Sequence, residues 1–271
     1  MRPPLEQYSA IEICCCRSSL GILILYLIIR HEKLAIYNKF QQPIKWLLAR
    51  AFIGLFFFGT FTYCVGQGAV STVFLSQNMA PMITSIAAMY LFKEKLTRIE
   101  VINLLIGFGG VALMLLPKEE SQASKPTDII LILLIISLPF QMSCLQLFIR
   151  QMKDVHYAII NFYYTLVSAI GYALYVMYQY STNAYSLAQK FSFTNLSILF
   201  FTSLSHVGAI IFWTLAFQNG KAGKVGIITY SQLIYSMIVD LLIFDIRFTW
   251  LQGVGMLIVF ASSFIVALTK Y

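Results

Sequence analysis

Long apolar runs separated by short polar links form the dominant pattern of this chain. An α-helix needs about 20 predominantly apolar residues to cross the roughly 30 Å hydrocarbon core of a bilayer, and the runs are close to that length. The pattern therefore predicts an all-α integral membrane protein with about nine transmembrane helices. The expected spans are residues 12–29, 46–65, 70–92, 99–116, 127–149, 157–178, 195–217, 224–244 and 250–268.

A second feature is a module that occurs twice. Residues 70–111 and 221–262 each contain an apolar run that ends at an acidic residue, a short charged link and a second apolar run. A shift of 151 positions aligns Pro81 with Gln232. Weakly repeated halves in a membrane chain are typical of a transporter whose substrate path lies between the repeats.

Composition agrees with a membrane protein and argues against two other classes. Hydrophobic residues make up 59% of the chain, charged residues make up 11%, and the mean hydropathy is +0.78. A soluble protein of 271 residues with so few charges could not cover its surface, so most of the surface must face lipid. The net charge of +8 comes largely from basic residues in short loops. There they set topology or contact anionic headgroups, and they form no nucleic-acid-binding stripe.

Lys and Arg are distributed unequally between the two sides that alternating spans define. The positive-inside rule places the richer side in the cytoplasm, or in the matrix of a mitochondrion. The C-terminus is then inside and the N-terminus outside. Five basic residues lie on the outer side, and the inner side collects twelve, namely Arg30, Lys33, Lys39, Lys45, Lys93, Lys95, Arg98, Arg150, Lys153, Lys221, Lys224 and Lys270.

Two motifs carry a resemblance to a known family. They are PMITSIAAMYLFKEKLT at residues 81–97 and ITYSQLIYSMIVDLLIFDIRFTWLQGVG at residues 228–255, and Arg17 in EICCCRSSLGILIL adds a third signal. The chain resembles the drug/metabolite transporter superfamily, specifically its EamA-type members and the solute-carrier-35G-like branch. The resemblance implies ten helices in two inverted five-helix repeats. It also implies secondary transport of a small organic solute or metabolite by alternating access.

The chain departs from that family pattern in its number of helices. Pairing Gly21 with Gly171 makes residues 12–29 the counterpart of the second helix of the second half, so the family's first helix is missing. The expected organisation is a first repeat of four helices at residues 1–117 and a second repeat of five at residues 118–271. The missing helix leaves another reading open, a transporter-derived structural subunit of a larger membrane complex without transport activity.

The resemblance further implies a substrate-binding site lined by the repeated module. Gln77 and Asn78 precede Pro81 by four and three residues, where proline frees a backbone carbonyl. We expect them to face Gln232 and Tyr235, which share a helix face, although polar helix–helix contacts explain the first two equally well. The neutral candidates favour a polar or zwitterionic solute and comprise Gln77, Asn78, Thr84, His206, Tyr230, Gln232 and Tyr235.

Three ionisable residues within the spans each leave two readings open. Arg17 either binds an anionic solute or pairs with Glu12 or a lipid headgroup. Asp240 either marks the cavity or reaches the membrane interface, and with Arg17 it forms a candidate coupling or charge pair. His206 either titrates near neutral pH or bonds as a neutral imidazole to a neighbouring helix.

Chemistry other than transport finds little support in the sequence. The five cysteines form no CxxC pair and have no histidine at metal-ligand spacing. No phosphate-binding loop or nucleophile elbow occurs, so we expect no metal, no cofactor and no enzymatic activity.

The expected partners are a small-molecule solute and the lipid bilayer, without nucleic acid. A homodimer or a larger membrane assembly is compatible with the sequence. A plasma or endomembrane location is favoured, and the mitochondrial inner membrane is the alternative.

The charge distribution generates a prediction of topology. A tag placed after Tyr271 should lie on the cytoplasmic or matrix side, and a tag before Met1 on the opposite side. Protease protection of each tag in sealed vesicles measures this directly. Two tags protected on the same side would contradict the arrangement with nine spans.

Overall fold

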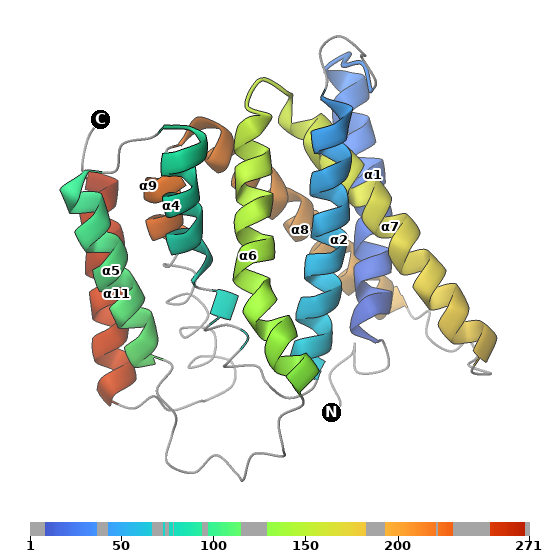
Figure 1. Cartoon of the computed structure of the whole chain (residues 1–271). Coiled ribbons are helices and arrows are strands. Elements are labelled where there is room, and N and C mark those ends of the chain that lie inside the picture. The colour runs from blue at the N-terminus through green and yellow to red at the C-terminus, as the bar shows by residue number, and fades with distance from the viewer. Residues whose placement is uncertain are drawn as a thin grey trace. The chain divides into compact units, whose positions relative to one another are not determined.

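A computed structural model describes residues 9–36, 43–66, 73, 76–77, 79–93, 97–114, 129–182, 193–220, 222–229 and 250–268. Within these ranges the regular structure is α-helical and no strand occurs (Figure 1). The helices are α1 (Ala10–His31), α2 (Ile44–Gly66), α4 (Ala80–Leu91), α5 (Arg98–Met114), α6 (Ile129–Gln151), α7 (Tyr157–Thr182), α8 (Phe193–Asn219), α9 (Ala222–Thr229) and α11 (Trp250–Leu268).

Each expected span overlaps a helix, although the spans 70–92 and 224–244 lie only partly within the described residues. The prediction of an all-α integral membrane protein is confirmed. Two shorter helices, Ala80–Leu91 and Val101–Gly110, are also apolar. Within the described residues, five helices are long and apolar enough to cross a membrane, at Ile11–His31, Ile44–Cys64, Ile129–Gln151, Tyr157–Ser181 and Asn195–Asn219.

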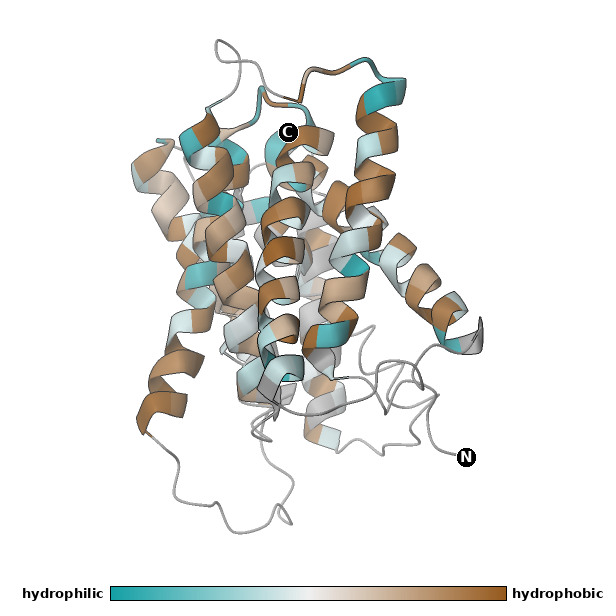
Figure 2. Cartoon of the chain, turned by 90° about the vertical axis from the view of Figure 1, so that its right-hand side faces the viewer, coloured by the Kyte–Doolittle hydropathy of each residue, from teal (hydrophilic) through white to brown (hydrophobic). Residues whose placement is uncertain are grey.

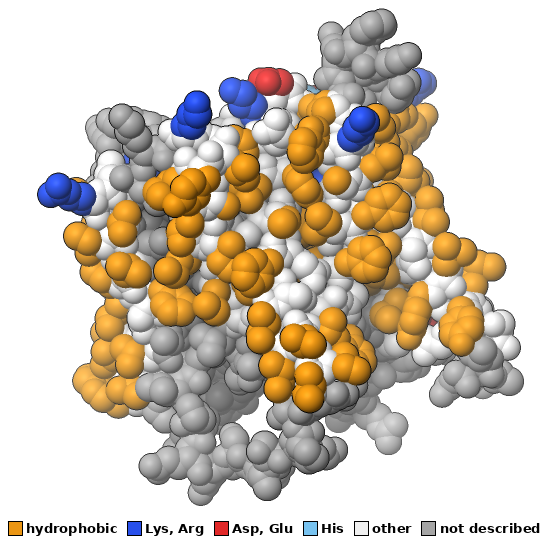
Figure 3. Space-filling view, in the orientation of Figure 1, with side chains coloured by type: hydrophobic (Ala, Val, Ile, Leu, Met, Phe, Trp, Pro, Cys, Tyr) orange, Lys and Arg blue, Asp and Glu red, His pale blue; other side chains and the backbone are white. Residues whose placement is uncertain are grey.

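The outer surfaces of the helices are apolar along their length. Figure 2 shows hydrophobic residues throughout the helices, and in Figure 3 hydrophobic side chains cover the helix surfaces while Lys and Arg lie near helix ends. Phe212 is 75% exposed, Ile129 is 73% exposed and Leu27 is 66% exposed. Apolar surface of this extent is stable against lipid tails and marks a membrane-facing protein.

The chain divides into two compact units that each take helices from both halves of the sequence. Unit 1 comprises residues 1–62 and 148–219, and unit 2 comprises residues 63–147 and 220–271. Unit 1 therefore contains α1, α7, α8 and most of α2, while unit 2 contains α4, α5, α9, α11 and most of α6. The predicted division into repeats at residues 1–117 and 118–271 stays a prediction.

In unit 1, α1 packs against α7 and α8, and α1 and α7 are antiparallel. Gly21 lies at this contact, where a Cβ would be in ordinary van der Waals contact with Val207 Cγ2 at 3.4 Å and Thr165 Cγ2 at 3.5 Å. The apolar core of this contact consists of Leu25, Ile29, Ala158, Phe162 and Val207.

Helix α1 begins within a capping box, which explains the acidic residue in its first turn. The Ser9 side chain accepts a hydrogen bond from the Glu12 backbone N–H (3.2 Å), and Glu12 Oε2 accepts one from the Ser9 N–H (2.6 Å). These bonds satisfy two of the free donors at the helix start. The glutamate therefore supports the span at residues 12–29 and does not weaken it.

In unit 2, a proline inside α6 determines a contact between helices. Pro139 has no N–H, so the carbonyl of Ile135, four residues earlier, loses its intrahelical partner. The Ser76 hydroxyl donates to that carbonyl at 2.6 Å. Pro81, by contrast, lies in the first turn of α4, where a missing N–H is tolerated.

Helices α5 and α11 of unit 2 pack extensively against each other and run in opposite directions (Figure 1). The Ser262 hydroxyl of α11 donates to the Asn103 carbonyl of α5 at 2.8 Å, and both residues are buried.

The packing of α7 on α2 generates a prediction of stability. A Cβ at Gly171 would lie 2.7 Å from Leu55 Cδ2, whereas a Cβ at Gly208 would meet nothing within 4 Å. Gly171→Val should therefore destabilise the protein by about 1–3 kcal/mol through overpacking. Thermal unfolding in detergent, with Gly208→Val as the matched control, measures the difference. Equal midpoints for the two variants would show that α7 and α2 do not pack here as described.

Candidate functional site

A buried arginine joins three helices of unit 1. Arg50 of α2 is 6% exposed and donates from Nη2 to Asn161 Oδ1 of α7 at 3.1 Å and from Nη1 to the Ile160 carbonyl at 3.4 Å. Thr214 of α8 donates to the same Asn161 oxygen at 3.0 Å. The Arg50 guanidinium also lies 5.1 Å from the ring centroid of Tyr164, within cation–π range. Neutral groups thus hold this cation in place.

The sequence interpretation missed Arg50 and its network. An arginine several residues inside the expected span 46–65 was the available signal, because charges at membrane depth usually face the interior of a bundle. Its partners could not be read from the sequence, since Asn161 lies more than one hundred positions away along the chain.

Arg17 and His206, both expected as site residues, come together in unit 1 around Phe58. The Arg17 guanidinium lies 5.0 Å from the Phe58 ring centroid. The His206 ring meets the same phenyl ring edge-on, with centroids 6.3 Å apart. A single aromatic side chain of α2 therefore contacts a polar residue of α1 and one of α8.

Three buried polar atoms near Arg17 have no hydrogen-bond partner within the described part of the chain. They are Arg17 Nε, Tyr172 Oη and His206 Nε2. Arg17 and His206 contact the same Phe58 ring, and Tyr172 lies on α7, which packs against the helix of Arg17. We name Arg17, Tyr172 and His206, with Phe58, the Arg17 cluster. The predicted bond from His206 to a neighbouring helix does not form among the described residues.

The alternative reading that Arg17 pairs with Glu12 does not match the geometry. The Glu12 carboxylate accepts from the Ser9 N–H and from the Tyr180 hydroxyl of α7. Arg17 makes its hydrogen bond to Cys14 Sγ at 3.6 Å instead, and no ion pair links it to Glu12. The carboxylate at the start of α1 is therefore used for capping and for the contact with α7.

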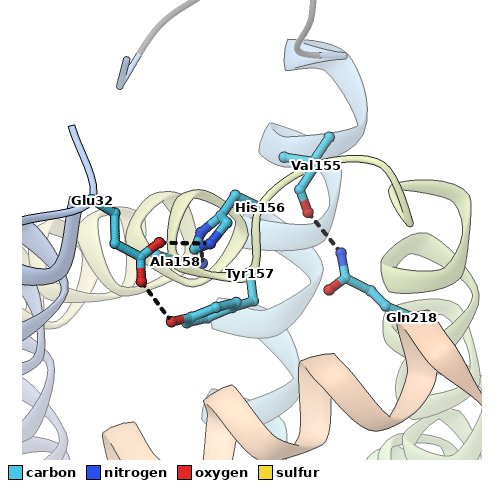
Figure 4. Close-up of polar contacts among 6 residues, drawn as sticks. All are labelled: Glu32, Val155, His156, Tyr157, Ala158 and Gln218. Atoms are coloured by element: carbon cyan, nitrogen blue, oxygen red, sulfur yellow. Dashed lines mark hydrogen bonds and ion pairs between the residues drawn. The ribbon is translucent and has the colours of Figure 1, made fainter. Parts of the chain in front are cut away.

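The end of α1 and the start of α7 meet in a second polar cluster (Figure 4). We name Glu32, His156 and Tyr157 the Glu32 cluster. His156 Nε2 lies 2.8 Å from Glu32 Oε2, and the Tyr157 hydroxyl donates to Glu32 Oε1 at 3.3 Å. His156 Nδ1 accepts from the Ala158 N–H at 3.3 Å, which leaves Nε2 as the donor to the carboxylate. Nearby, Gln218 of α8 donates to the Val155 carbonyl at 2.8 Å.

In unit 2, the candidate Thr84 is fully buried between helices. Its hydroxyl donates to the Ala80 carbonyl at 2.8 Å and lies against the side-chain amide of Gln146 in α6. The Ser143 hydroxyl of α6 reaches the same carbonyl at 3.0 Å. Gln77 lies in a short described segment and is half-buried. Thr84 therefore has a helix–helix role, and its predicted role in substrate binding stays a prediction.

The other expected site residues fall outside the described part of the chain. Their assignment as binding or coupling residues stays a prediction, and these residues are Asn78, Tyr230, Gln232, Tyr235 and Asp240. Among the residues that are described, no group of three His, Cys, Asp or Glu side chains could hold a metal ion.

Comparison with protein families identifies the class of this chain. The EamA-like transporter family matches it in two stretches, residues 1–116 and 129–268. The chain therefore belongs to the EamA-like transporter family, and the resemblance to the drug/metabolite transporter superfamily is confirmed. Membership supports a role in transport and implies a small-molecule solute, a lipid environment and a multi-pass membrane location.

Individual relatives agree with this family. A probable transport protein of Saccharomyces cerevisiae is 28% identical over 222 residues, which cover 74% of this chain and 61% of the yeast protein. An uncharacterized membrane protein of the same yeast is 25% identical, over 81% of this chain and 56% of its own length. The chain thus spans less than two thirds of these yeast relatives. An uncharacterized transporter of Helicobacter pylori is 22% identical, over 97% of this chain and 87% of the bacterial protein.

A solved structure shares the fold. A crystal structure of a protein superposes with a TM-score of 0.81 at 12% sequence identity, covering 99% of this chain and 92% of the other. At that identity the likeness concerns the arrangement of helices alone.

The Arg50 network generates a prediction of stability. Asn161→Leu should destabilise the protein by roughly 3 kcal/mol, because it removes the best partner of a buried cation. Thr165→Val is the matched control on the same helix, since the Thr165 hydroxyl bonds only carbonyls of its own helix, at 2.9 and 3.0 Å. Thermal unfolding in detergent compares the two. Equal losses in both variants would show that Asn161 does not stabilise Arg50.

Proposed function

We propose that this chain is a secondary transporter that moves a small organic solute across the membrane by alternating access. The observation that carries the proposal is the antiparallel arrangement of helices that correspond across the two halves. A shift of about 150 residues relates α1 to α7, α2 to α8, and α5 to α11. Such pairs are expected of inverted repeats, whose exchange of conformations opens a site to each side in turn.

The contacts within unit 1 support opposite directions for two of these pairs. Glu32 at the end of α1 meets Tyr157 at the start of α7, and Glu12 meets Tyr180 at the other ends. For α2 and α8, Arg50 near the start of α2 connects through Asn161 to the last turns of α8. The family match in two stretches, residues 1–116 and 129–268, agrees with the proposed repeats.

The α1–α7 pair also has the polar contacts that an alternating mechanism requires. At one end Tyr157 donates to Glu32, and at the other Tyr180 donates to Glu12. Each contact consists of a few hydrogen bonds, which are worth about 1–3 kcal/mol when a charged group takes part. We propose that one end separates while the other stays closed, so that solute enters from one side and leaves on the other.

Counterflow in proteoliposomes tests this function. Purified chain is reconstituted into vesicles loaded with an unlabelled amino acid, carboxylate, nucleoside or sugar, and uptake of the same labelled compound is followed. A carrier takes up label faster when the unlabelled compound is inside, whereas a channel shows no such stimulation. We expect stimulated uptake for at least one compound class and none in protein-free vesicles.

Variants connect the flux to the expected binding residues. Gln232→Leu or Asn78→Leu should abolish counterflow without reducing membrane insertion. Phe212→Leu, at a side chain 75% exposed on α8, is the control and should leave counterflow unchanged. If no compound is exchanged and the chain is instead retained at fixed stoichiometry in a native membrane complex, the transport proposal fails and the structural-subunit reading replaces it.

A further inference from the structure

The interior of unit 1 contains two arginines and no described carboxylate. Arg17 and Arg50 lie within α1 and α2, whereas the carboxylates described in this unit are at helix ends or in a link, at Glu12, Glu32 and Asp154. Charges at membrane depth are normally compensated by an opposite charge or by dense hydrogen bonding. The two cations differ in how this is achieved.

Arg50 is compensated by the protein itself. Asn161 and the Ile160 carbonyl accept its hydrogen bonds, and Tyr164 covers its face. The Arg50 side chain is buried and is linked to α7 through Asn161, and through the same Asn161 to Thr214 of α8. A ligand would have to displace these contacts in order to bind it.

Arg17 is not compensated in this way. Its hydrogen-bond partner among the described residues is the weakly accepting sulfur of Cys14. Its Nε–H, like that of Arg50, is buried without a partner in the described part of the chain, so the difference between the two arginines lies in their terminal Nη groups. The face of its guanidinium lies on Phe58, which supplies attraction to the cation but no acceptor atom.

Two more unpartnered polar atoms accompany Arg17. The Tyr172 hydroxyl is buried on α7, where the residue is 6% exposed, and His206 Nε2 is buried on α8. His206 and Arg17 contact the same Phe58 ring, and Tyr172 lies on α7, the helix that packs against α1. An arginine N–H and a tyrosine O–H are donors, and an imidazole nitrogen donates when it carries the proton. The Arg17 cluster therefore brings polar groups of three helices together, and it contains a cation but no carboxylate.

We propose that the Arg17 cluster binds an anionic oxygen group, a carboxylate or a phosphate, of the transported solute. Such a group supplies a negative charge for the guanidinium and several acceptor oxygens for Arg17, Tyr172 and His206 at once. That the group belongs to a solute rests on the proposed transport function. Binding of an oxyanion at these residues does not, and it is measured independently of flux.

The test uses the full chain in nanodiscs of phosphatidylcholine, which carries no net charge. The thermal midpoint is measured against rising concentrations of benzoate, succinate or inorganic phosphate, at constant ionic strength set with chloride. A ligand that binds only the folded state raises the midpoint, because it stabilises that state by RT ln(1 + L/Kd), where L is the free ligand concentration. We expect at least one of the three probes to raise the midpoint of the unmodified chain.

Three variants assign the effect to residues. Arg17→Met should weaken the apparent affinity at least about tenfold, because it removes the charge-assisted bonds. Tyr172→Phe removes only one donor and should weaken affinity while the protein stays folded. Arg98→Met, at an exposed arginine at the start of α5, removes the same charge elsewhere and should leave the affinity unchanged. Without probe, Arg17→Met should melt no lower than the unmodified chain, because an uncompensated charge is lost.

Several results would overturn the proposal. One is that none of the three probes raises the midpoint. Another is that the rise is undiminished in both Arg17→Met and Tyr172→Phe. A third is that Arg98→Met weakens the apparent affinity as much as Arg17→Met does. If none of the probes raises the midpoint but phosphatidylglycerol in the nanodiscs does, and if this rise depends on Arg17, the cluster binds a lipid headgroup instead. Counterflow that persists unchanged in Arg17→Met would remove the proposal and leave the transport function intact. Oxyanion binding that depends on Arg17, in a chain that shows no counterflow, would support the oxyanion site and contradict the transport function.

Discussion

The lack of water in the hydrocarbon core is the constraint on which this structure depends, because every polar group there must find its partner within the protein. Pro139 frees the Ile135 carbonyl, and the Ser76 hydroxyl of another segment satisfies it. Arg50 lies inside α2 as a cation, and the Ile160 carbonyl and Asn161, which also bonds Thr214 of α8, accept hydrogen bonds from its two Nη groups. The same requirement thus produces both the contacts that fix α6 and those that join α2, α7 and α8.

Buried polar atoms without a hydrogen-bond partner in the described part of the chain are exceptions to this requirement. A buried polar atom without a partner costs free energy, and Arg17, Tyr172 and His206 each have such an atom within the described part of the chain. Binding sites commonly keep such uncompensated groups, since the ligand completes them. The transport function and the oxyanion site are therefore two parts of one proposal. In this proposal α1 and α7 are joined at both ends and carry ligand-binding groups between them.

Much of the fold could be predicted from the sequence, because span length and apolar composition are local properties. Each expected span overlaps a helix, and family and class follow from short motifs. Arg17 and His206 were expected, since ionisable residues within apolar runs are conspicuous. The partners were not, because Asn161 bonds Arg50 and Tyr180 bonds Glu12 over sequence separations above one hundred residues. No local pattern encodes such contacts. The role of Glu12 in capping α1 is likewise seen only in the structure, where its side chain accepts from the Ser9 N–H.

The most direct test of alternating access is to lock each end of the α1–α7 pair in turn. In a chain without native cysteines, Glu32→Cys with Tyr157→Cys joins one end, and Glu12→Cys with Tyr180→Cys joins the other, through a short reducible bifunctional thiol reagent. The measured quantity is counterflow before cross-linking, after it, and after reduction. Alternating access predicts that either lock stops counterflow and that reduction restores it. Undiminished counterflow with either end locked would contradict the account.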